Sequence, residues 1–153
     1  MLVVNGGQDP KFKRWFELLI EKLDEHSIDD SYVLYVWNNN VLDLKIKEYC
    51  NDREALVYME PEASERLEHF HAVPLQRLYE AARAAGAEYI VTLDSDAHPI
   101  SNGWLSKLVG LVNSKTPLAG VWRDELSEGI SPYIHASCLC IRTDFIEENR
   151  LRF

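Results

Sequence analysis

Short apolar runs alternate along this chain with longer stretches whose apolar residues recur every three or four positions. The longer stretches predict helices, because apolar residues at that spacing form one buried helix face, and the short runs predict strands. The expected strands are Leu2–Val4, Tyr32–Trp37, Ala55–Met59, Tyr89–Leu93, Leu118–Trp122 and Ser137–Arg142. Strands separated by helical connections favour a parallel sheet with helices on both faces. The sequence therefore predicts an α/β fold with a mostly parallel sheet.

The expected helices begin and end at residues that favour helix boundaries. Asp9 and Pro10 suit the start of the first helix, and Pro74 suits the first turn of another. Gly86 is expected to end the Pro74 helix, and Ser101 is the expected N-cap of the next. Further short helices are expected at Val41–Tyr49 and from Asp144 onward, and loops at Glu60–Glu68 and Ser127–Pro132.

Length and composition indicate one ordinary globular domain. The chain has 153 residues, of which 46% are hydrophobic and 27% are charged, so we expect a single domain spanning residues 1–153. No apolar run approaches the roughly 20 residues of a membrane span, and the first residues lack the pattern of a signal peptide. We therefore expect no membrane-spanning segment.

The formal net charge of −9 argues against nucleic acid or an anionic membrane as a partner, since both need a basic surface. An acidic protein that handles a phosphorylated ligand needs a local cation, which a bound metal would supply. The three cysteines, Cys50, Cys138 and Cys140, are odd in number and lack the spacing of a disulfide framework. Reduced, partly buried thiols are expected, which fits a cytoplasmic location.

An acidic pair follows the apolar run Tyr89–Leu93. Asp94 and Asp96 are separated by Ser95, and alternation along an extended chain would place both carboxylates on the same side. Mg²⁺ and Mn²⁺ prefer carboxylate oxygens and keep open positions for substrate phosphates. The triplet predicts a divalent-metal site with Asp94 and Asp96 as ligands. The alternative is a turn in which the carboxylates cap the next element.

Two other expected strands end in polar or glycine residues. Asn5-Gly6-Gly7 follows the first strand, and Asn38-Asn39-Asn40 follows the second. Ligands of open α/β sheets bind beyond the carboxyl ends of the strands, so these segments and the acidic triplet are expected to line one cleft. Turn chemistry alone is the alternative, because Asn and Gly both tolerate left-handed backbone.

The stretch Ala81–Pro99 resembles the centre of GT-A glycosyltransferases, especially those of family 2. In that family a helix, a short turn and an apolar strand lead into a metal-binding acidic triplet, followed by a Pro and a helix that opens with an aromatic-Leu pair. Here the pair is Trp104-Leu105, and Tyr35–Asn40 resembles the second strand of the same fold. The order of elements is similar from Met1 to the end of the chain.

The resemblance implies a nucleoside diphosphate sugar as donor and Mn²⁺ or Mg²⁺ as cofactor. Asp96 would bind the metal that neutralises the leaving diphosphate, and Asp94 would contact the ribose or a metal-bound water. The residues expected to contact the donor nucleotide are Asn5, Gly6, Asn38, Asn39, Asp94 and Ser95.

The chain also departs from the family pattern. Family 2 enzymes usually carry the catalytic base on a helix well beyond the acidic triplet, and Asp144–Glu148 lies too early for that helix. We therefore expect the chain to be C-terminally incomplete. Within it, Asp124 and Glu125 are the candidate bases, because a carboxylate at that strand end could reach the donor cleft. The alternative is an exposed, solvated pair.

The function expected is transfer of a hexose from the donor to a hydroxyl of a saccharide, protein or lipid acceptor, with inversion. One alternative is a sugar-nucleotide-binding module without catalysis. The other is a related nucleotidyltransferase, although the first loop lacks the basic residues such enzymes use for a triphosphate. Among the histidines, His69 and His71 lack a third ligand for zinc, and His135 is expected just before the last strand, near the acceptor. Trp122 and Tyr133 could stack on sugar rings.

Overall fold

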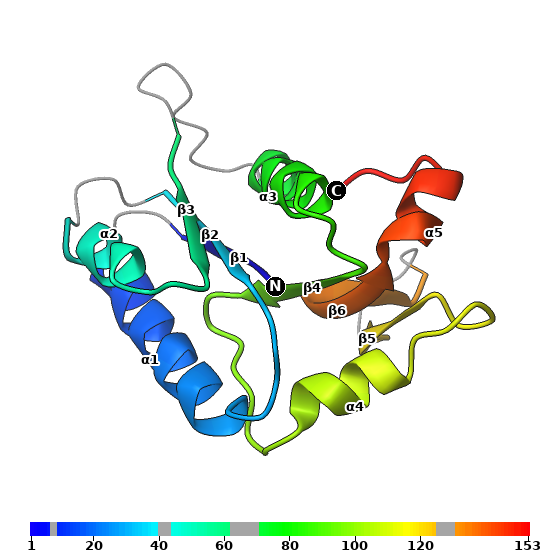
Figure 1. The fold of residues 1–153 in the computed structure, drawn as a ribbon, viewed down its shortest axis with the longest axis horizontal. Helices are drawn as coiled ribbons and strands as arrows, with labels where there is room; N and C mark the ends of the chain where they lie inside the picture. Colours follow the sequence, from blue (N-terminus) through cyan, green and yellow to red (C-terminus); the bar gives the residue numbers. More distant parts are fainter. Residues whose placement is uncertain (7–8, 40–43, 62–70, 125–130) are drawn as a thin grey trace.

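A six-stranded sheet carries helices on both of its faces (Figure 1). The computed structural model describes residues 1–6, 9–39, 44–61, 71–124 and 131–153. In chain order the elements are β1 (Leu2–Asn5), α1 (Pro10–His26), β2 (Leu34–Asn38), α2 (Leu44–Asn51), β3 (Leu56–Met59), α3 (Ala72–Ala84), β4 (Tyr89–Asp94), α4 (Trp104–Gly110), β5 (Leu118–Arg123), β6 (Tyr133–Arg142) and α5 (Thr143–Glu148). None of the described helices is both long and apolar enough to cross a membrane.

The strands lie in the order β3-β2-β1-β4-β6-β5. Each neighbouring pair among β1 to β4 is parallel, whereas β6 runs antiparallel to both β4 and β5. Five strands therefore share one direction, which confirms the predicted mostly parallel sheet. The register pairs Asn5 with Asn38 and Val4 with Asp94, so three of the predicted polar strand ends meet at one edge. We call this the carboxyl edge.

Alternation along the central strands separates two hydrophobic cores. Val3 of β1 packs with α1, α2 and α4 on one face, while Leu2 and Val4 pack with α3 and α5 on the other. The α1 residues that are buried are Phe16, Leu19, Ile20 and Leu23, and those of α3 are Pro74, Leu75, Leu78, Tyr79 and Ala82. Each fully buried Leu or Phe side chain contributes about 1.5–3 kcal/mol, so these helix faces fix the sheet between them.

Asp9 and Gly86 lie at helix boundaries as predicted, whereas Ser101 does not. The side chain of Asp9 caps α1 by accepting from the backbone N–H of Lys11 at 3.0 Å, and Gly86 follows α3 with φ of +83°. Ser101, the predicted N-cap of α4, instead lies exposed in the preceding turn. Gly103 occupies the cap position with φ of +66°, a left-handed conformation that favours glycine.

The last strand begins earlier than predicted. β6 starts at Tyr133 rather than Ser137, because its first residues pair with the edge strand β5 and only its later residues pair with β4. His135, expected before this strand, is therefore inside it and pairs with Val121. The three cysteines are free thiols, as predicted, with Cys50 and Cys140 buried.

Candidate functional site

Two buried asparagines join the carboxyl ends of β1 and β2. Asn5 and Asn38 are both 0% exposed, and Nδ2 of Asn5 donates to Oδ1 of Asn38 at 2.9 Å. The backbone N–H of Asn39 also reaches the carbonyl oxygen of Asn5, at 3.4 Å. Because buried amides need hydrogen-bond partners, this pair fixes the two strand ends relative to each other. Oδ1 of Asn5 has no hydrogen-bond partner among the described residues, and nucleotide contact by Asn5 and Asn38 stays a prediction.

The Asn pair continues into a polar chain that crosses to the neighbouring strand. Nδ2 of Asn38 donates to Oη of Tyr58 at 3.1 Å, and Tyr58 donates to Glu60 at 3.0 Å. Lys47 closes the chain with a 2.9 Å ion pair to Glu60. Burial is the main cause that raises the pKa of Tyr58 to about 12, so its hydroxyl keeps its proton and remains a donor.

Sequence reasoning missed Tyr58 and Glu60. Their only sequence signal is their position at and just after the end of an expected strand. Because β3 lies beside β2 in the sheet order, its end belongs to the same carboxyl edge. Finding these two residues would have required a prediction of the order of the strands in the sheet as well as of the strands themselves.

Asn39 and Gly6 each lie close to an aromatic side chain. Oδ1 of Asn39 accepts from Nε1 of Trp37 at 2.8 Å, so that oxygen is already engaged. A Cβ at Gly6 would lie 2.3 Å from the ring of Phe12, so the backbone here approaches α1 more closely than a side chain allows. Gly7 and Asn40 lie outside the described residues, and nucleotide contact by Gly6 and Asn39 stays a prediction.

The acidic triplet forms a turn at the end of β4. The backbone N–H of Ala97 donates to the carbonyl oxygen of Asp94 at 2.9 Å, so the chain does not continue in extended form. The expectation that strand alternation aligns the two carboxylates is therefore wrong, because a closed turn replaces the period of two. Ser95 is buried, Asp94 is partly buried and Asp96 is exposed.

His71 accompanies Asp94 at this edge. It lies just before α3, and its Nε2 is 3.9 Å from Oδ1 of Asp94, with side-chain exposures of 52% and 26% respectively. Among the described residues, no three His, Cys, Asp or Glu side chains are grouped as a metal site. Mg²⁺ sites commonly use one or two protein carboxylates together with phosphate oxygens and water. Asp94 and Asp96 match that smaller donor set in number and type of ligand, and metal binding by them stays a prediction.

The predicted bases lie farther from the triplet. Asp124 is exposed directly after β5, and Glu125 lies outside the described residues. Since β6 separates β5 from β4, the strand that Asp124 follows lies two strand positions from β4, or about 10 Å across the sheet at a strand spacing of about 4.8 Å. His135 has its Nδ1 engaged as acceptor from the backbone N–H of Ser137 at 3.0 Å, leaving Nε2 as the protonated nitrogen.

The β5–β6 hairpin also exposes aromatic side chains beside this edge. Trp122 is 58% exposed and Tyr133 is 41% exposed, and the Tyr133 and His135 rings lie 5.7 Å apart. Exposed rings of this kind can stack on flat apolar faces of a ligand. Sugar stacking by Trp122 and Tyr133 stays a prediction.

No protein-family model matches the sequence, and no curated protein matches it. Two solved structures are similar to it: S. aureus TarS 1-349, and the same protein in complex with UDP-GlcNAc. Both superpose with a TM-score of 0.69 and 13% sequence identity over 99% of this chain. The chain spans 49% and 47% of the two structures, about half their length. At this identity the similarity shows the fold, a mixed α/β domain of GT-A type.

Proposed function

We propose that this chain is the nucleotide-sugar-binding domain of a metal-dependent glycosyltransferase. The observation that carries the proposal is the Asp94-Ser95-Asp96 turn at the carboxyl end of β4, the central strand of a GT-A-type sheet. A protein of similar fold, S. aureus TarS, has been crystallised with UDP-GlcNAc. That complex supports a nucleoside diphosphate sugar as the class of ligand.

Each residue of the carboxyl edge has a proposed task. Asp94 and Asp96 would hold Mn²⁺ or Mg²⁺, which supplies positive charge for the leaving diphosphate. The Asn5–Asn38 pair keeps the two strand ends at a fixed separation, so the donor edge is ordered before the ligand arrives. His71, beside Asp94, is placed to donate a hydrogen bond to a phosphate oxygen.

Transfer with inversion needs a general base that takes the proton of the acceptor hydroxyl, and a carboxylate is the group we propose. Asp124 is our candidate within the described residues, and its side chain is exposed at the same edge. A donor-binding module without catalysis is the second candidate function. The observation that favours it is the separation of two strand positions between β5, which Asp124 follows, and β4, which ends at Asp94.

Calorimetric titration of UDP, GDP and dTDP, with Mn²⁺ and then with EDTA, tests the proposal. We expect UDP to bind only with metal, and Asp96→Asn to weaken that binding at least about tenfold, because a charge-assisted contact contributes about 1.5–3 kcal/mol. Asp52→Asn, an exposed carboxylate just after α2, is the matched control. Equal metal-dependent affinity in the Asp96 and control variants would refute the site.

A separate measurement distinguishes the two candidate functions. We expect the enzyme to release UDP from a UDP-sugar in the presence of an acceptor, and Asp124→Asn to slow that release without changing donor affinity. Donor binding with no release under any acceptor tested would support the binding module instead.

A further inference from the structure

The β5–β6 hairpin is irregular beside the acidic triplet. Between Gly120 and Val121 the pairing of β5 with β6 shifts by three residues, so β6 carries a bulge over residues 136–138. The hydroxyl of Thr92 donates to the carbonyl oxygen of Ala136 at 2.6 Å, which attaches the bulge to the strand that ends in the triplet. Bulges are frequent next to functional sites, where they change the direction of the strand and of its side chains.

Just past the bulge, Trp122 lies on the same face of the sheet as Asp94. Ile90 of β4 and Leu118 of β5 both pack in the core beneath α3 and α5. Asp94 and Trp122 each follow four residues later in the same strands, so alternation with a period of two returns both side chains to that face. Figure 1 shows α3 and α5 on this side of the sheet and α4 on the other.

Trp122 and Asp94 also lie at the same level along the strands. Gly120 pairs with Leu139, and Leu139 pairs with Thr92, so two further residues along each strand reach Trp122 in β5 and Asp94 in β4. The two strands are two positions apart in the sheet, or about 10 Å. A ligand held at the triplet would therefore have the indole of Trp122 beside it on one continuous face.

Trp122 and Ile134 form an apolar surface at this level, which we call the Trp122 platform. The two residues are cross-strand partners, and Trp122 is 58% exposed. A Cβ at Gly120 would lie 2.8 Å from Cγ2 of Ile134, so the glycine leaves room for the Ile134 side chain on this face. An exposed indole offers a flat apolar face with an N–H at its edge, which suits a ring that is apolar on its faces and polar at its rim.

The other exposed aromatic residue of the hairpin faces away from Asp94. Tyr133 and His135 lie one residue on either side of Ile134, so alternation turns both to the opposite face of the sheet from Trp122. Their rings lie 5.7 Å apart, as expected for residues on a common face. Of the two aromatic residues expected to stack on sugars, only Trp122 therefore shares a face with the triplet.

We propose that the Trp122 platform binds an uncharged saccharide as the acceptor, with a sugar ring stacked on the indole. The inference rests on the proposed function and adds the class of acceptor to it. Asp124, the proposed general base, follows Trp122 by two residues, so a stacked ring would present its hydroxyls next to that carboxylate.

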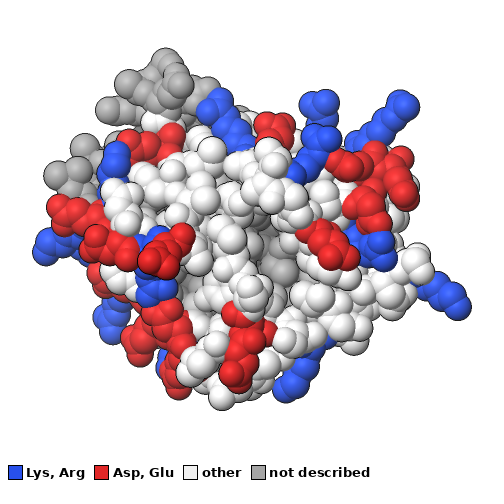
Figure 2. All heavy atoms as spheres, in the orientation of Figure 1, with Lys and Arg blue, Asp and Glu red and all other residues white. Residues whose placement is uncertain are grey.

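The charges around the platform favour an uncharged acceptor. The formal net charge is −9, and Asp94 and Asp96 lie at the same edge of the sheet. Arg123 pairs with Tyr133 and so points to the opposite face from Trp122. On the face drawn in Figure 2, Lys and Arg side chains are interspersed with Asp and Glu rather than gathered into a basic area. An anionic acceptor would meet net repulsion.

Four probes test the class of ligand. We would titrate cellobiose, lactose, sorbitol and hexanol into the 153-residue chain and follow the backbone amide resonances of β5 and β6 by NMR. We expect saturable shifts with at least one of the two disaccharides, and none with sorbitol, which has hydroxyls but no ring. UDP with Mg²⁺ is titrated separately, so the donor site is measured independently.

Three variants test the residue. Trp122→Ala should weaken disaccharide binding at least about tenfold, because a truncated aromatic anchor removes most of the contact surface. Trp122→Tyr retains a ring and should lose less. Tyr133→Ala removes an exposed ring of the same hairpin from the opposite face and is the matched control, with no change expected. Affinity for UDP with Mg²⁺ should be the same in all three variants.

The proposal is overturned if neither disaccharide binds while UDP does, or if hexanol alone gives a saturable shift, which would indicate an apolar acceptor. It is also overturned if Trp122→Ala and Tyr133→Ala change disaccharide affinity equally. Disaccharide binding that depends on Trp122 in the absence of UDP binding would support the platform and refute the donor site instead. Circular dichroism checks the fold of each variant, and Trp122→Tyr with the probe series still decides the result if Trp122→Ala does not fold.

Discussion

The buried pair of Asn5 and Asn38 makes a quantitative prediction about stability. In Asn38→Leu, Nδ2 of Asn5 loses its acceptor inside a site that is 0% exposed. A buried donor left unsatisfied costs about 1–3 kcal/mol. Asn5→Leu removes one hydrogen bond from Asn38, which keeps its bond to Tyr58, and should cost about 0.5–1.5 kcal/mol.

The double variant Asn5→Leu/Asn38→Leu replaces both polar groups by apolar groups of similar size. Such a replacement can be nearly neutral, so the double variant should be more stable than the sum of the single losses implies. We expect a coupling free energy of about 1–2 kcal/mol between the two sites. A single loss of about 2 kcal/mol would lower Tm by about 4–8 °C in a domain of this length.

Urea unfolding followed by circular dichroism measures the free energy of unfolding of the four proteins in this cycle. Asn51→Leu, at an exposed position at the end of α2, is the control and should change stability by less than about 0.5 kcal/mol. The reasoning would be refuted if the loss of stability in the double variant equalled the sum of the losses in the two single variants within about 0.3–0.5 kcal/mol. The two amides would then not stabilise the carboxyl edge through each other.

Three further predictions concern the sheet, one tyrosine and the thiols. Gly120→Ala should lower the free energy of unfolding in urea by about 1–3 kcal/mol, since its Cβ would lie 2.4 Å from a backbone carbonyl oxygen of β6. Gly110→Ala is the control and should not lower it, because the Cβ would have open space around it. Burial raises the pKa of Tyr58 from 10.0 to about 12, so its contribution to the free energy of unfolding is present below pH 10 and is lost as pH rises through about 12. In Tyr58→Phe the free energy of unfolding should therefore vary less between pH 10 and pH 12 than in the unaltered chain. Equal pH dependence in the two proteins would contradict the prediction. Burial also raises the pKa of Cys50 and Cys140 to about 11. Both thiols should therefore react with a disulfide reagent at about pH 8 at least about a hundredfold more slowly in the folded chain than in urea. Equal reaction rates in the two conditions would show that the thiols are accessible in the folded chain.

The sequence was sufficient for features that depend on neighbouring residues. The helical spacing of apolar residues, the capping side chain of Asp9 and the left-handed Gly86 each act within a few positions, so α1 and the end of α3 could be predicted. The common direction of the first four strands followed from their helical connections, and with it the meeting of Asn5, Asn38 and Asp94 at one edge.

Other features arise only where distant segments pack together. The insertion of β6 between β4 and β5 determines how far Asp124 lies from Asp94, and strand order is a property of the whole sheet rather than of any one run. The turn at Asp94 replaced the expected extended geometry because a local backbone hydrogen bond competes with strand alternation.

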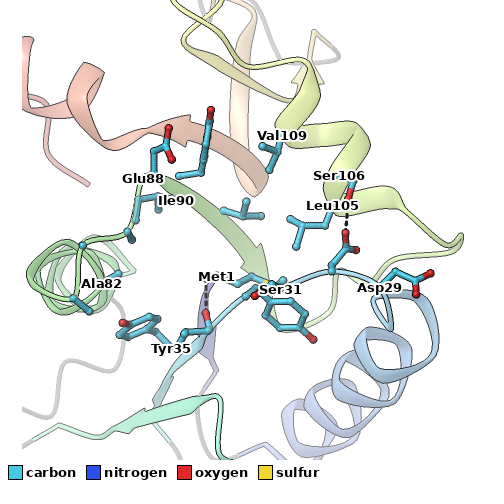
Figure 3. A pocket seen from close by; sticks show the side chains of 18 residues that line it. Met1, Asp29, Ser31, Tyr35, Ala82, Glu88, Ile90, Leu105, Ser106 and Val109 are labelled. Atoms are coloured by element: carbon cyan, nitrogen blue, oxygen red, sulfur yellow. Dashed lines mark hydrogen bonds between the residues drawn. The ribbon is translucent and has the colours of Figure 1, made fainter.

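A cavity of about 460 Å³ at the amino ends of β1, β2 and β4 shows the same limit most clearly (Figure 3). Its lining combines Met1, the segment before β2, the end of α3 and one side of α4, which lie far apart in the sequence. The sequence determined that Asp30 is a carboxylate near the start of a strand. Only the tertiary structure decided that one of its oxygens is buried without a hydrogen-bond partner among the described residues, because burial depends on which side chains from other elements fill the space around it.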